Sequence, residues 1–253
     1  MNVALIGDVH ANLPALEAVL ADVCARGVKR IWNVGDSVGY GAFPDECVHL
    51  LRDVGAESIL GNYDRKVLQF PRKRKKWHQS KAPEKFLAFR WAYENLSTEG
   101  REWLRSRPDD IRLEAEGFRI LITHGSPDSE DEHLRPATTE RRLAELADVA
   151  DADVVICGHS HEPFHRTARG VHFINTGSVG RPEGGDPRTG YATLTLSRGK
   201  LTVTHHRLEY DVDRAVDAIR AADLPEAFGR MLRQGCNLDD VLAGAEDCEE
   251  EDI

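Results

Sequence analysis

Five short apolar segments of this 253-residue chain each end in glycine or threonine beside a side chain that can bind a metal ion. They end at Gly7-Asp8-Val9-His10, Gly35-Asp36, Gly61-Asn62, Thr123-His124-Gly125 and Gly158-His159-Ser160-His161. In open α/β sheets, ligand sites lie beyond the carboxyl ends of the strands, so we expect these side chains to meet at one rim. Carboxylates, imidazoles and an amide oxygen suit borderline divalent ions such as Mn, Fe, Zn, Co or Ni.

The first sixty residues predict alternating strands and helices. Val3 to Ile6, Ile31 to Val34 and Ser58 to Leu60 are short apolar runs, which is typical of buried strands. Between them, apolar residues recur at helical spacing from the cap Asn12 to Gly27, and again from Pro44 to Val54. Strands that alternate with helices indicate a parallel sheet.

Residues 65–110 carry no strand signal, and we expect a helical insertion there. Strands return in the second half of the chain, separated by glycine-containing turns, with a helix from Thr139 to Ala150. The predicted strands are Ile111 to Ala115, Arg119 to Thr123, Val154 to Cys157, Phe164 to Thr167, Val171 to Asn175, Tyr191 to Leu196 and Leu201 to Leu208.

We predict a single domain over residues 1–210. Two further helices are predicted near residues 212–222 and 225–233, and we expect this helical segment, 211–245, to pack on that domain. The acidic residues 246–253 are expected to be disordered. Met1 leads directly into a strand without a signal-peptide pattern, and no apolar run approaches the roughly 20 residues of a membrane span. We therefore expect a cytoplasmic protein with no membrane partner.

The charge is acidic overall but unevenly distributed. The formal net charge is -10, which speaks against a general nucleic-acid coat. Ten Lys or Arg residues nevertheless lie between Arg65 and Arg90, with Glu84 as the one acid, whereas the stretch from Glu246 to Asp252 holds six acids. The run from Pro71 to Trp77 is either a solvated helix face, which we favour, or a surface for a polyanion.

A shared carboxylate would be needed if two ions are bound, because such ions lie about 3.5–4 Å apart. Asp36 is the best candidate, since its strand is expected to neighbour that of Asp8. An isolated Asp-x-His or His-x-His is a weak signal. Five such motifs in order at strand ends are much harder to obtain by accident.

The ordered set resembles the calcineurin-like metallophosphoesterases, and most closely their small bacterial and archaeal phosphodiesterase branch. That family has Asp-x-His, Gly-Asp, Gly-Asn-His-Asp or Glu, a later His, and Gly-His-x-His, and the similarity covers roughly residues 1–210. The segment Asn175-Thr176-Gly177-Ser178-Val179-Gly180 also resembles this branch. The resemblance implies a β-sandwich of two mixed sheets flanked by helices, in four αββα layers.

The resemblance also implies roles for individual residues. Asp36 would bridge two divalent ions, with manganese the first choice, and a water or hydroxide between them would attack phosphorus. Asp36, Asn62, Tyr63 and His124 form the implied catalytic group. The implied ligands of the first ion are Asp8, His10 and His161, and those of the second are Asn62, His124 and His159.

Position 63 departs from the family pattern, which often has a histidine there that is thought to protonate the leaving oxygen. Tyr63 has an unperturbed pKa near 10, which suits a general acid poorly at neutral pH. We therefore expect substrates with good leaving groups, such as aryl esters, nucleotides or anhydrides. Gly35-Asp36 also runs into Ser37 without the Asp-Arg-Gly element of protein phosphatases, so a phosphodiesterase is favoured over a phosphoprotein phosphatase.

Other interpretations and residues remain open at this stage. One retromer subunit uses this fold as a scaffold, so a non-catalytic metal-binding module is an alternative, and a nuclease using the basic insertion is another. A small phosphorylated molecule is the favoured partner, ahead of nucleic acid, and no oligomeric state is indicated. Arg181 is the best candidate for a substrate contact, with His133 and His165 behind it, while Asp64 either supports the site or caps a helix.

Overall fold

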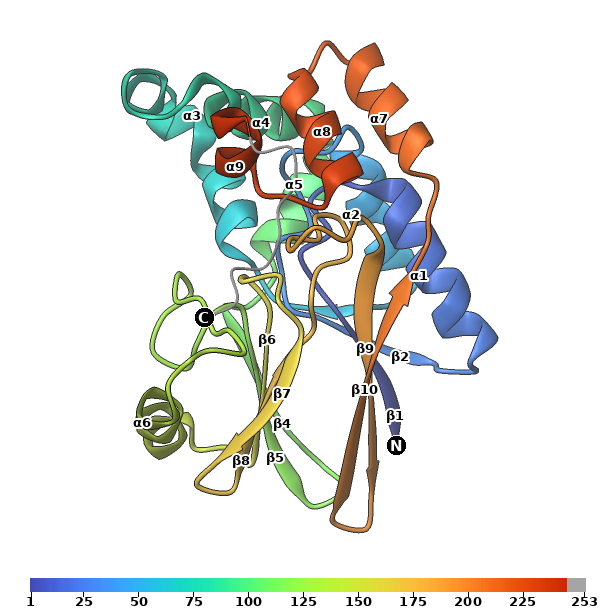
Figure 1. Cartoon of the computed structure of the whole chain (residues 1–253), viewed down its shortest axis with the longest axis vertical. Helices are drawn as coiled ribbons and strands as arrows, with labels where there is room; N and C mark the ends of the chain where they lie inside the picture. The colour runs from blue at the N-terminus through green and yellow to red at the C-terminus, as the bar shows by residue number, and fades with distance from the viewer. Residues whose placement is uncertain (245–253) are drawn as a thin grey trace.

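A computed structural model describes residues 1–244, and two five-stranded mixed sheets form its centre (Figure 1). The first sheet has the order β10-β9-β1-β2-β3, in which β1, β2 and β3 run parallel and β9 pairs antiparallel with both of its neighbours, β1 and β10. Its strands are β1 (Asn2–Ile6), β2 (Arg30–Asn33), β3 (Glu57–Ser58), β9 (Thr189–Ser197) and β10 (Lys200–Leu208). The parallel pairing predicted for the N-terminal strands is confirmed.

The third strand differs from its prediction. We expected Ser58 to Leu60, but β3 ends at Ser58. Leu60 N donates its hydrogen bond to Pro108 O at 2.8 Å instead of to a neighbouring strand. The chain therefore turns away from the sheet at this point and leads directly into the insertion.

The second sheet has the order β4-β5-β6-β8-β7. Strands β5, β6 and β8 are parallel, and the antiparallel strands β4 and β7 form its edges. Its members are β4 (Asp110–Ala115), β5 (Phe118–Thr123), β6 (Val154–Cys157), β7 (Phe164–Ala168) and β8 (Val171–Asn175). The predicted sandwich of two mixed sheets is confirmed.

The main core lies between the two sheets. Leu5, Trp32 and Val34 from the first sheet pack in one buried cluster with Ile122 and Ile156 from the second. The opposite faces of the central strands are also apolar, because helices cover them. Strands that are buried on both faces appear in a sequence as continuous apolar runs, and this is the pattern from which they were predicted.

Helices on the outer faces complete four layers. On the first sheet, α1 (Leu13–Ala25) and α2 (Pro44–Asp53) pack in a buried cluster that includes Ala4 and Ile6 of β1. On the second sheet, α6 (Glu140–Ala150) packs on strands β6 to β8. As predicted, Asn12 caps α1, since its side chain accepts a hydrogen bond from Ala15 N at 3.3 Å.

The predicted helical insertion consists of α3 (Asn62–Ser80), α4 (Pro83–Asn95) and α5 (Thr98–Arg105). Phe70, Trp77 and Phe89 form its buried core together with Leu104. The helix α3 begins at Asn62, so its first turn presents a predicted metal ligand at the rim of the sandwich.

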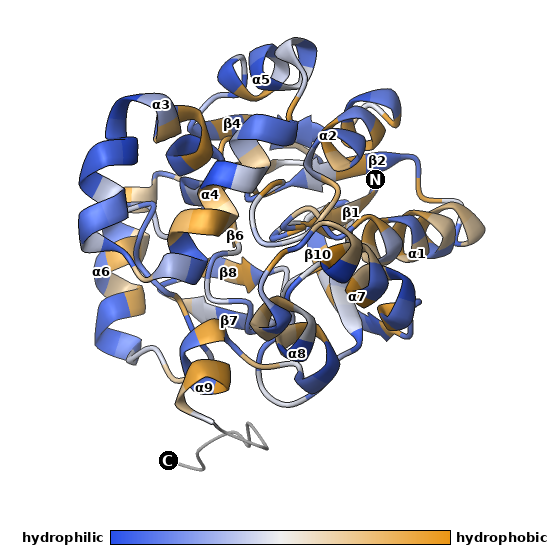
Figure 2. Cartoon of the chain, turned by 90° about the horizontal axis from the view of Figure 1, so that it is seen from above, coloured by the Kyte–Doolittle hydropathy of each residue, from blue (hydrophilic) through white to orange (hydrophobic). Residues whose placement is uncertain are grey.

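Three C-terminal helices lie over the same rim beside the insertion (Figure 2). They are α7 (Val212–Ala221), α8 (Glu226–Gln234) and α9 (Leu238–Ala243). Phe228 of α8 and Leu238 of α9 share a buried cluster with Ala88 of α4 and with Tyr40. The acidic segment 246–253 lies outside the described residues. Among residues 1–244, every helix is too short or too polar to cross a membrane.

Candidate metal centre

The side chains predicted to bind metal converge at one rim of the sandwich. Asp8 and His10 follow β1, and Asp36 follows β2. Asn62 begins α3, while the loops after β5 and β6 supply the three remaining histidines. Both sheets therefore contribute candidate ligands, and six of these residues form two groups whose ligand atoms lie close together.

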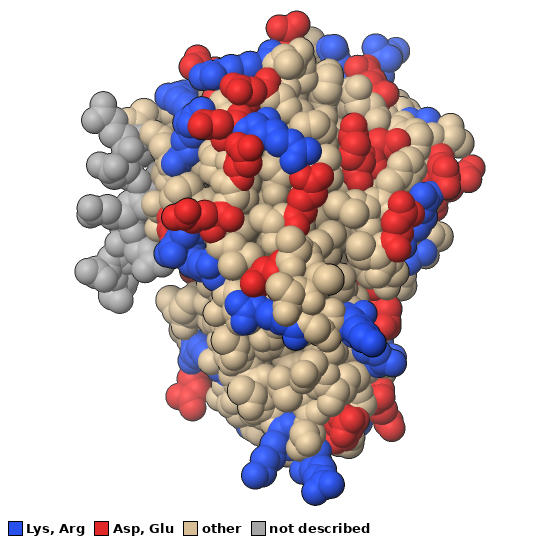
Figure 3. All heavy atoms as spheres, turned by 90° about the vertical axis from the view of Figure 1, so that its right-hand side faces the viewer, with Lys and Arg blue, Asp and Glu red and all other residues tan. Residues whose placement is uncertain are grey.

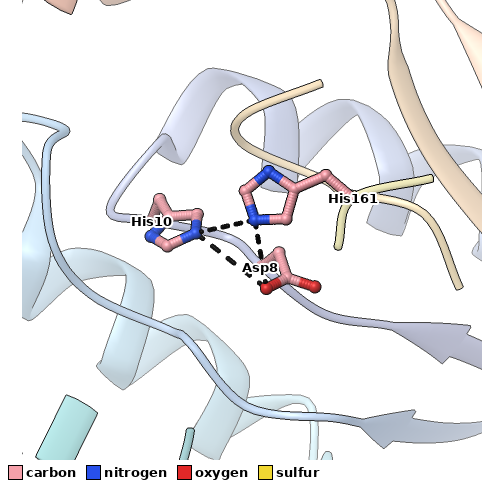
Figure 4. A group of neighbouring side chains, drawn as sticks. All are labelled: Asp8, His10 and His161. Atoms are coloured by element: carbon pink, nitrogen blue, oxygen red, sulfur yellow. Dashed lines mark hydrogen bonds and ion pairs between the residues drawn. The ribbon is translucent and has the colours of Figure 1, made fainter. Parts of the chain in front are cut away.

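The first group consists of Asp8, His10 and His161, all of them buried (Figure 4). His10 Nε2 lies 3.2 Å from His161 Nε2, and His161 Nε2 lies 3.3 Å from Asp8 Oδ1. The distance from His10 Nε2 to Asp8 Oδ1 is 3.9 Å. Three candidate ligand atoms thus face one common point.

The second group consists of Asp36, His124 and His159. His124 Nε2 lies 3.4 Å from Asp36 Oδ2 and 3.2 Å from His159 Nδ1. The same Asp36 Oδ2 lies 3.9 Å from His10 Nε2 of the first group. One carboxylate oxygen therefore lies between the two groups, which is the placement that a bridging ligand requires.

Several buried atoms at this rim lack a hydrogen-bond partner within residues 1–244. They include Asp8 Oδ1 of the first group and Asn62 Oδ1. The amide of Asn62 is oriented by Asp131, because Asn62 Nδ2 donates to Asp131 Oδ1 at 2.8 Å. Leaving a buried oxygen without a partner costs about 1–3 kcal/mol, and a bound cation would remove that cost. The donor set therefore fits two divalent ions.

Backbone carbonyls fix the orientation of two imidazoles. His124 Nδ1 donates to Val34 O at 2.8 Å, and His161 Nδ1 donates to Arg181 O at 2.7 Å. Because Nδ1 carries the proton in both rings, Nε2 of each is left to face the site. Such outer contacts commonly orient metal-binding histidines.

The loops that carry the ligands adopt an uncommon backbone conformation. Asp8, His10, Asp36, His159 and His161 all have φ between 47° and 66°. Non-glycine residues in this left-handed region cost of order 1–3 kcal/mol each and cluster at functional sites. The surrounding hydrogen bonds hold the strained backbone in place; for example, His10 N donates to Asp36 O at 2.9 Å.

Glycine is required at two positions where the backbone passes close to Asp36 or Asp8. A Cβ on Gly61 would lie 2.2 Å from the backbone nitrogen of Asp36, and a Cβ on Gly158 would lie 2.4 Å from Asp8 Oδ2. These contacts explain why glycine precedes the metal-competent residue in these two motifs.

Burial keeps two of the histidines neutral. Loss of hydration lowers the pKa of His10 to about 3 and that of His159 to about 4. Neutral imidazoles have a lone pair available for a cation. The low pKa values of His10 and His159 therefore suit them to a ligand role at neutral pH.

Neighbouring carboxylates raise, rather than lower, the pKa of the other two histidines. Burial alone would lower the pKa of His124, but the charge of Asp36 outweighs it and raises that pKa to about 10. The charge of Asp8 likewise overcomes burial and raises the pKa of His161 to about 9. Burial opposes ionisation of Asp8 and Asp36, yet the neighbouring histidines lower the pKa of both carboxyls.

A cavity of about 320 Å³ opens beside the two groups. Tyr63 lines it, but its hydroxyl is hydrogen-bonded to that of Tyr40 at 2.6 Å. Burial and the neighbouring Tyr40 raise the pKa of Tyr63 well above its usual value. The phenol is therefore a still weaker acid than the sequence suggested.

The candidate substrate residues differ in whether they line the cavity. Arg181 lines it with only 9% of its surface exposed. Its guanidinium lies 4.3 Å from the Tyr40 ring centroid and pairs with Glu183 at 2.7 Å. His133 also lines the cavity, stacked on His159 with ring centroids 4.1 Å apart. His165 is not among the cavity residues, and its Nε2 lies 3.1 Å from His172 Nδ1.

Asp64 joins two loops of the site. It accepts hydrogen bonds from Gly61 N at 3.2 Å, which caps α3, and from Val38 N at 3.0 Å, in the loop that carries Asp36. Burial and the charge of Asp36 raise the pKa of Asp64 to about 7. Asp64 therefore serves both as a helix cap and as support for the Asp36 loop.

Sequence reasoning did not single out Asp131, Tyr40 or Glu183. Asp131 orients the Asn62 amide, Tyr40 holds the Tyr63 hydroxyl, and Glu183 pairs with Arg181 and lies 3.3 Å from His161 Nδ1. The only advance signal for Asp131 was its place in an acidic loop between two ligand segments. Tyr40 and Glu183 carried no signal, because the Tyr40–Tyr63 and Glu183–His161 contacts join separate segments of the chain.

Comparisons with known proteins agree with this geometry. The family model described as the calcineurin-like phosphoesterase superfamily domain matches residues 1–199. An uncharacterised protein of Methanocaldococcus jannaschii is 33% identical over 251 residues, covering 92% of this chain and 98% of that protein.

Two solved structures share the fold over almost their full lengths. The crystal structure of a metallophosphoesterase from Sphaerobacter thermophilus is 31% identical, with a TM-score of 0.77 over 93% of this chain and 99% of that one. A hypothetical protein from Pyrococcus horikoshii has a TM-score of 0.84 at 22% identity, over 92% and 98% of the two chains. With a matching family model, a close relative and the same fold, this chain belongs to the calcineurin-like phosphoesterase superfamily.

Proposed function

We propose that this protein is a phosphodiesterase that depends on two divalent metal ions, with manganese the first choice. The observation that carries the proposal is the position of Asp36 Oδ2, 3.4 Å from His124 Nε2 in one group and 3.9 Å from His10 Nε2 in the other. When bound, two such ions make a water nucleophile available near neutral pH and offset the charge that develops on phosphoryl oxygens.

The side chains at the site have separate roles in the proposed reaction. Asp8, His10 and His161 would hold one ion, and Asn62, His124 and His159 the other, with Asp36 shared. Arg181 is held beside the cavity by Glu183 and Tyr40, where its positive charge attracts a phosphate group.

The preference for diesters and other substrates with good leaving groups is supported by Tyr63. Its hydroxyl is engaged with Tyr40 and its pKa is raised, so it does not supply a proton readily near neutral pH. An alkoxide leaving group needs such a proton, whereas a nitrophenolate or a phosphate group leaves without one.

A non-catalytic metal-binding module is the second candidate, and the same Tyr63 favours it. A site that binds two ions but lacks an acid near the leaving group can serve as a rigid docking surface. Turnover of an activated diester separates the two candidates, because only the enzyme produces it.

The test compares bis-p-nitrophenyl phosphate with p-nitrophenyl phosphate after chelation and addition of each divalent ion in turn. We expect diester turnover to return with Mn²⁺ or a similar ion and to be lost in Asp36→Ala. The exposed variant Asp217→Ala on α7 is the charge-matched control and should retain full turnover. Absence of turnover in protein shown to hold two ions would reject the enzyme in favour of the module.

A further inference from the structure

Four lysines of the insertion gather beside the cavity of the candidate metal centre. Lys66 on α3 and Lys85 on α4 line the cavity itself. Lys73 and Lys81 are not among the cavity residues, and their Nζ atoms lie 5.5 Å and 5.3 Å from the ring centroid of Trp77. Lys81 is close enough to Lys66, Lys73 and Lys85 for their charges to lower its pKa. We refer to Lys66, Lys73, Lys81 and Lys85 as the lysine cluster.

Aromatic rings, two of them buried and one partly buried, pack against the cluster. The Tyr63 and Phe89 ring centroids are 5.1 Å apart, and those of Phe89 and Trp77 are 5.2 Å apart. Lys81 Nζ lies 5.4 Å from the Phe89 centroid, and Lys66 Nζ lies 5.3 Å from that of Tyr63. Trp77 is only 7% exposed and Phe89 2%, so their faces are not open to a stacked base. Recognition at this surface therefore depends on charge.

The positive charge of the cluster is only partly neutralised. Lys66 Nζ lies 3.5 Å from Asp131 Oδ1, and Lys85 Nζ lies 2.8 Å from Asp239 Oδ2. For Lys73 and Lys81, no carboxylate of residues 1–244 lies within ion-pair distance. Burial and the charges of the other three lysines lower the pKa of Lys81, which indicates repulsion within the cluster. A bound anion would relieve that repulsion.

The roof of the cavity limits the size of its ligand. Asn237, Leu238 and Asp239, at the start of α9, line the same cavity as the candidate metal ligands, and the pair of Asp239 with Lys85, another cavity residue, joins α9 to α4. A pocket of about 320 Å³ is of the size that holds a small molecule. A continuous polymer would have to displace this ion pair, so the observations favour a small ligand over a nucleic acid.

We propose that the substrate is a small molecule with a second phosphate group, which the lysine cluster binds while the scissile phosphate lies at the metal centre. This inference rests on the proposed phosphoesterase function and narrows its substrate class to bis- or polyphosphorylated small molecules. The lysines supply the ammonium donors that charge-assisted hydrogen bonds to phosphate require.

The test uses two probes that cannot be hydrolysed, methylphosphonate and the bis(methylene) analogue of tripolyphosphate. Their binding to the metal-loaded full chain is measured by calorimetry at fixed free metal concentration. In Lys73→Gln/Lys81→Gln we expect affinity for the triphosphate analogue to fall roughly tenfold, while that for methylphosphonate changes by no more than about twofold.

Two further variants control for folding and net charge. Lys73→Arg/Lys81→Arg keeps both positive charges and should retain binding of the triphosphate analogue. Lys29→Gln/Lys200→Gln removes the same net charge at exposed positions, beside the start of β2 and at the start of β10. Because β1 and β2 are parallel and β9 is antiparallel to β1, these lysines lie at the end of the sheet opposite the metal ligands. This variant should bind both probes normally.

The outcomes separate this inference from the proposed function. Unchanged selectivity between the probes in Lys73→Gln/Lys81→Gln overturns the lysine subsite, even if diester turnover is found. If Lys73→Gln/Lys81→Gln selectively loses binding of the triphosphate analogue, the subsite is supported even if no ester is hydrolysed. Tight binding of a single-stranded oligonucleotide that disappears in the same variant would overturn the small-molecule class and point to a nucleic acid.

Discussion

At the scale of single residues, Tyr63 sets the range of leaving groups. We expect Tyr63→His to raise turnover of an alkyl phosphate roughly 10²-fold, the lower end of the usual general-acid effect, because an imidazole can protonate the leaving oxygen near neutral pH. Aryl ester turnover should change little. Side-by-side steady-state kinetics on one alkyl and one aryl substrate measure this. If Tyr63→His leaves alkyl turnover unchanged while Tyr63→Phe also has no effect, position 63 does not determine the leaving group.

The histidine pKa values predict that metal binding releases protons. At pH 7, His10 and His159 are already neutral, with pKa values of about 3 and 4, whereas His124 and His161 are protonated, with values of about 10 and 9. Cations bound by these two histidines must displace the last two protons, so about two protons should be released at pH 7 when both candidate groups are filled. Metal affinity should rise with pH and level off above pH 10, where no proton is left to displace.

Calorimetric titration of the metal in buffers with different ionisation enthalpies gives the number of protons released. A value near zero at pH 7 would mean that His124 and His161 are not paired with carboxylates as imidazolium ions in the metal-free protein. Repeating the titration at increasing pH should show the number of released protons falling.

Placement at the shared rim was easiest to predict from sequence for residues that follow strands directly. Asp8, Asp36 and His124 stand where an apolar run ends, so the rule that strand ends share one rim was enough to bring them together. Asp131 stands in an irregular loop among Asp128, Glu130 and other acids, and nothing local distinguishes it from them. Its contact with Asn62 spans 69 positions in the chain and follows from tertiary packing alone.

At the scale of elements, the approach of α3 to the Asp36 loop controls the site. A Cβ at Gly61 would lie 2.2 Å from both the backbone nitrogen and Oδ1 of Asp36. We expect Gly61→Ala to destabilise the protein by about 1–3 kcal/mol, as overpacking does, and to reduce the metal content. Denaturant unfolding and elemental analysis measure the two effects.

A second glycine provides the matched control. Gly190 on β9 has no positive φ, and a Cβ there would have its nearest neighbour at 3.6 Å. Gly190→Ala should therefore retain both stability and metal. Equal behaviour of the two variants would show that the close contact at Gly61 does not support the site.

Whether a segment forms a helix or a strand was easier to predict from sequence than which strands pair with one another. The apolar runs indicated β1, β2 and β6, because these strands are covered on both faces. The pairing of β9 with β1 could not be derived from periodicity, although it matters for the site. It brings the loop after β8 beside Asp8, where Val179 N donates to Gly7 O at 3.0 Å and Gly180 N to Asp8 O at 2.9 Å.

At the scale of the whole molecule, the candidate ligands come from both sheets. Asp8 and Asp36 follow strands of the first sheet, while His124 and His161 follow strands of the second. Ions that bind only this folded arrangement stabilise it, by about 2.7 kcal/mol per site at a free concentration of 100 Kd. We expect chelation to lower the melting temperature and metal to restore it, measured by calorimetry. In Asp36→Ala the shift should shrink; an equal shift would place the stabilising ions elsewhere.

The surface charge on one face of the molecule does not indicate a nucleic-acid ligand. On the face that includes α1 and α7, Lys and Arg lie interspersed with Asp and Glu (Figure 3). Such a mixed face offers no extended basic track for a nucleic acid. The basic residues that matter for our inference lie instead on the insertion beside the cavity.

The spread of the ligands along the chain also determines when the centre can form during synthesis. A nascent chain that has emerged as far as the first turn of α3 carries Asp8, His10, Asp36 and Asn62, but none of the three later histidines. His124 emerges after β5, and the last two only after β6. Any ions held by the two groups could therefore be fully enclosed only after more than half of the polypeptide has left the ribosome and the second sheet has assembled on the first.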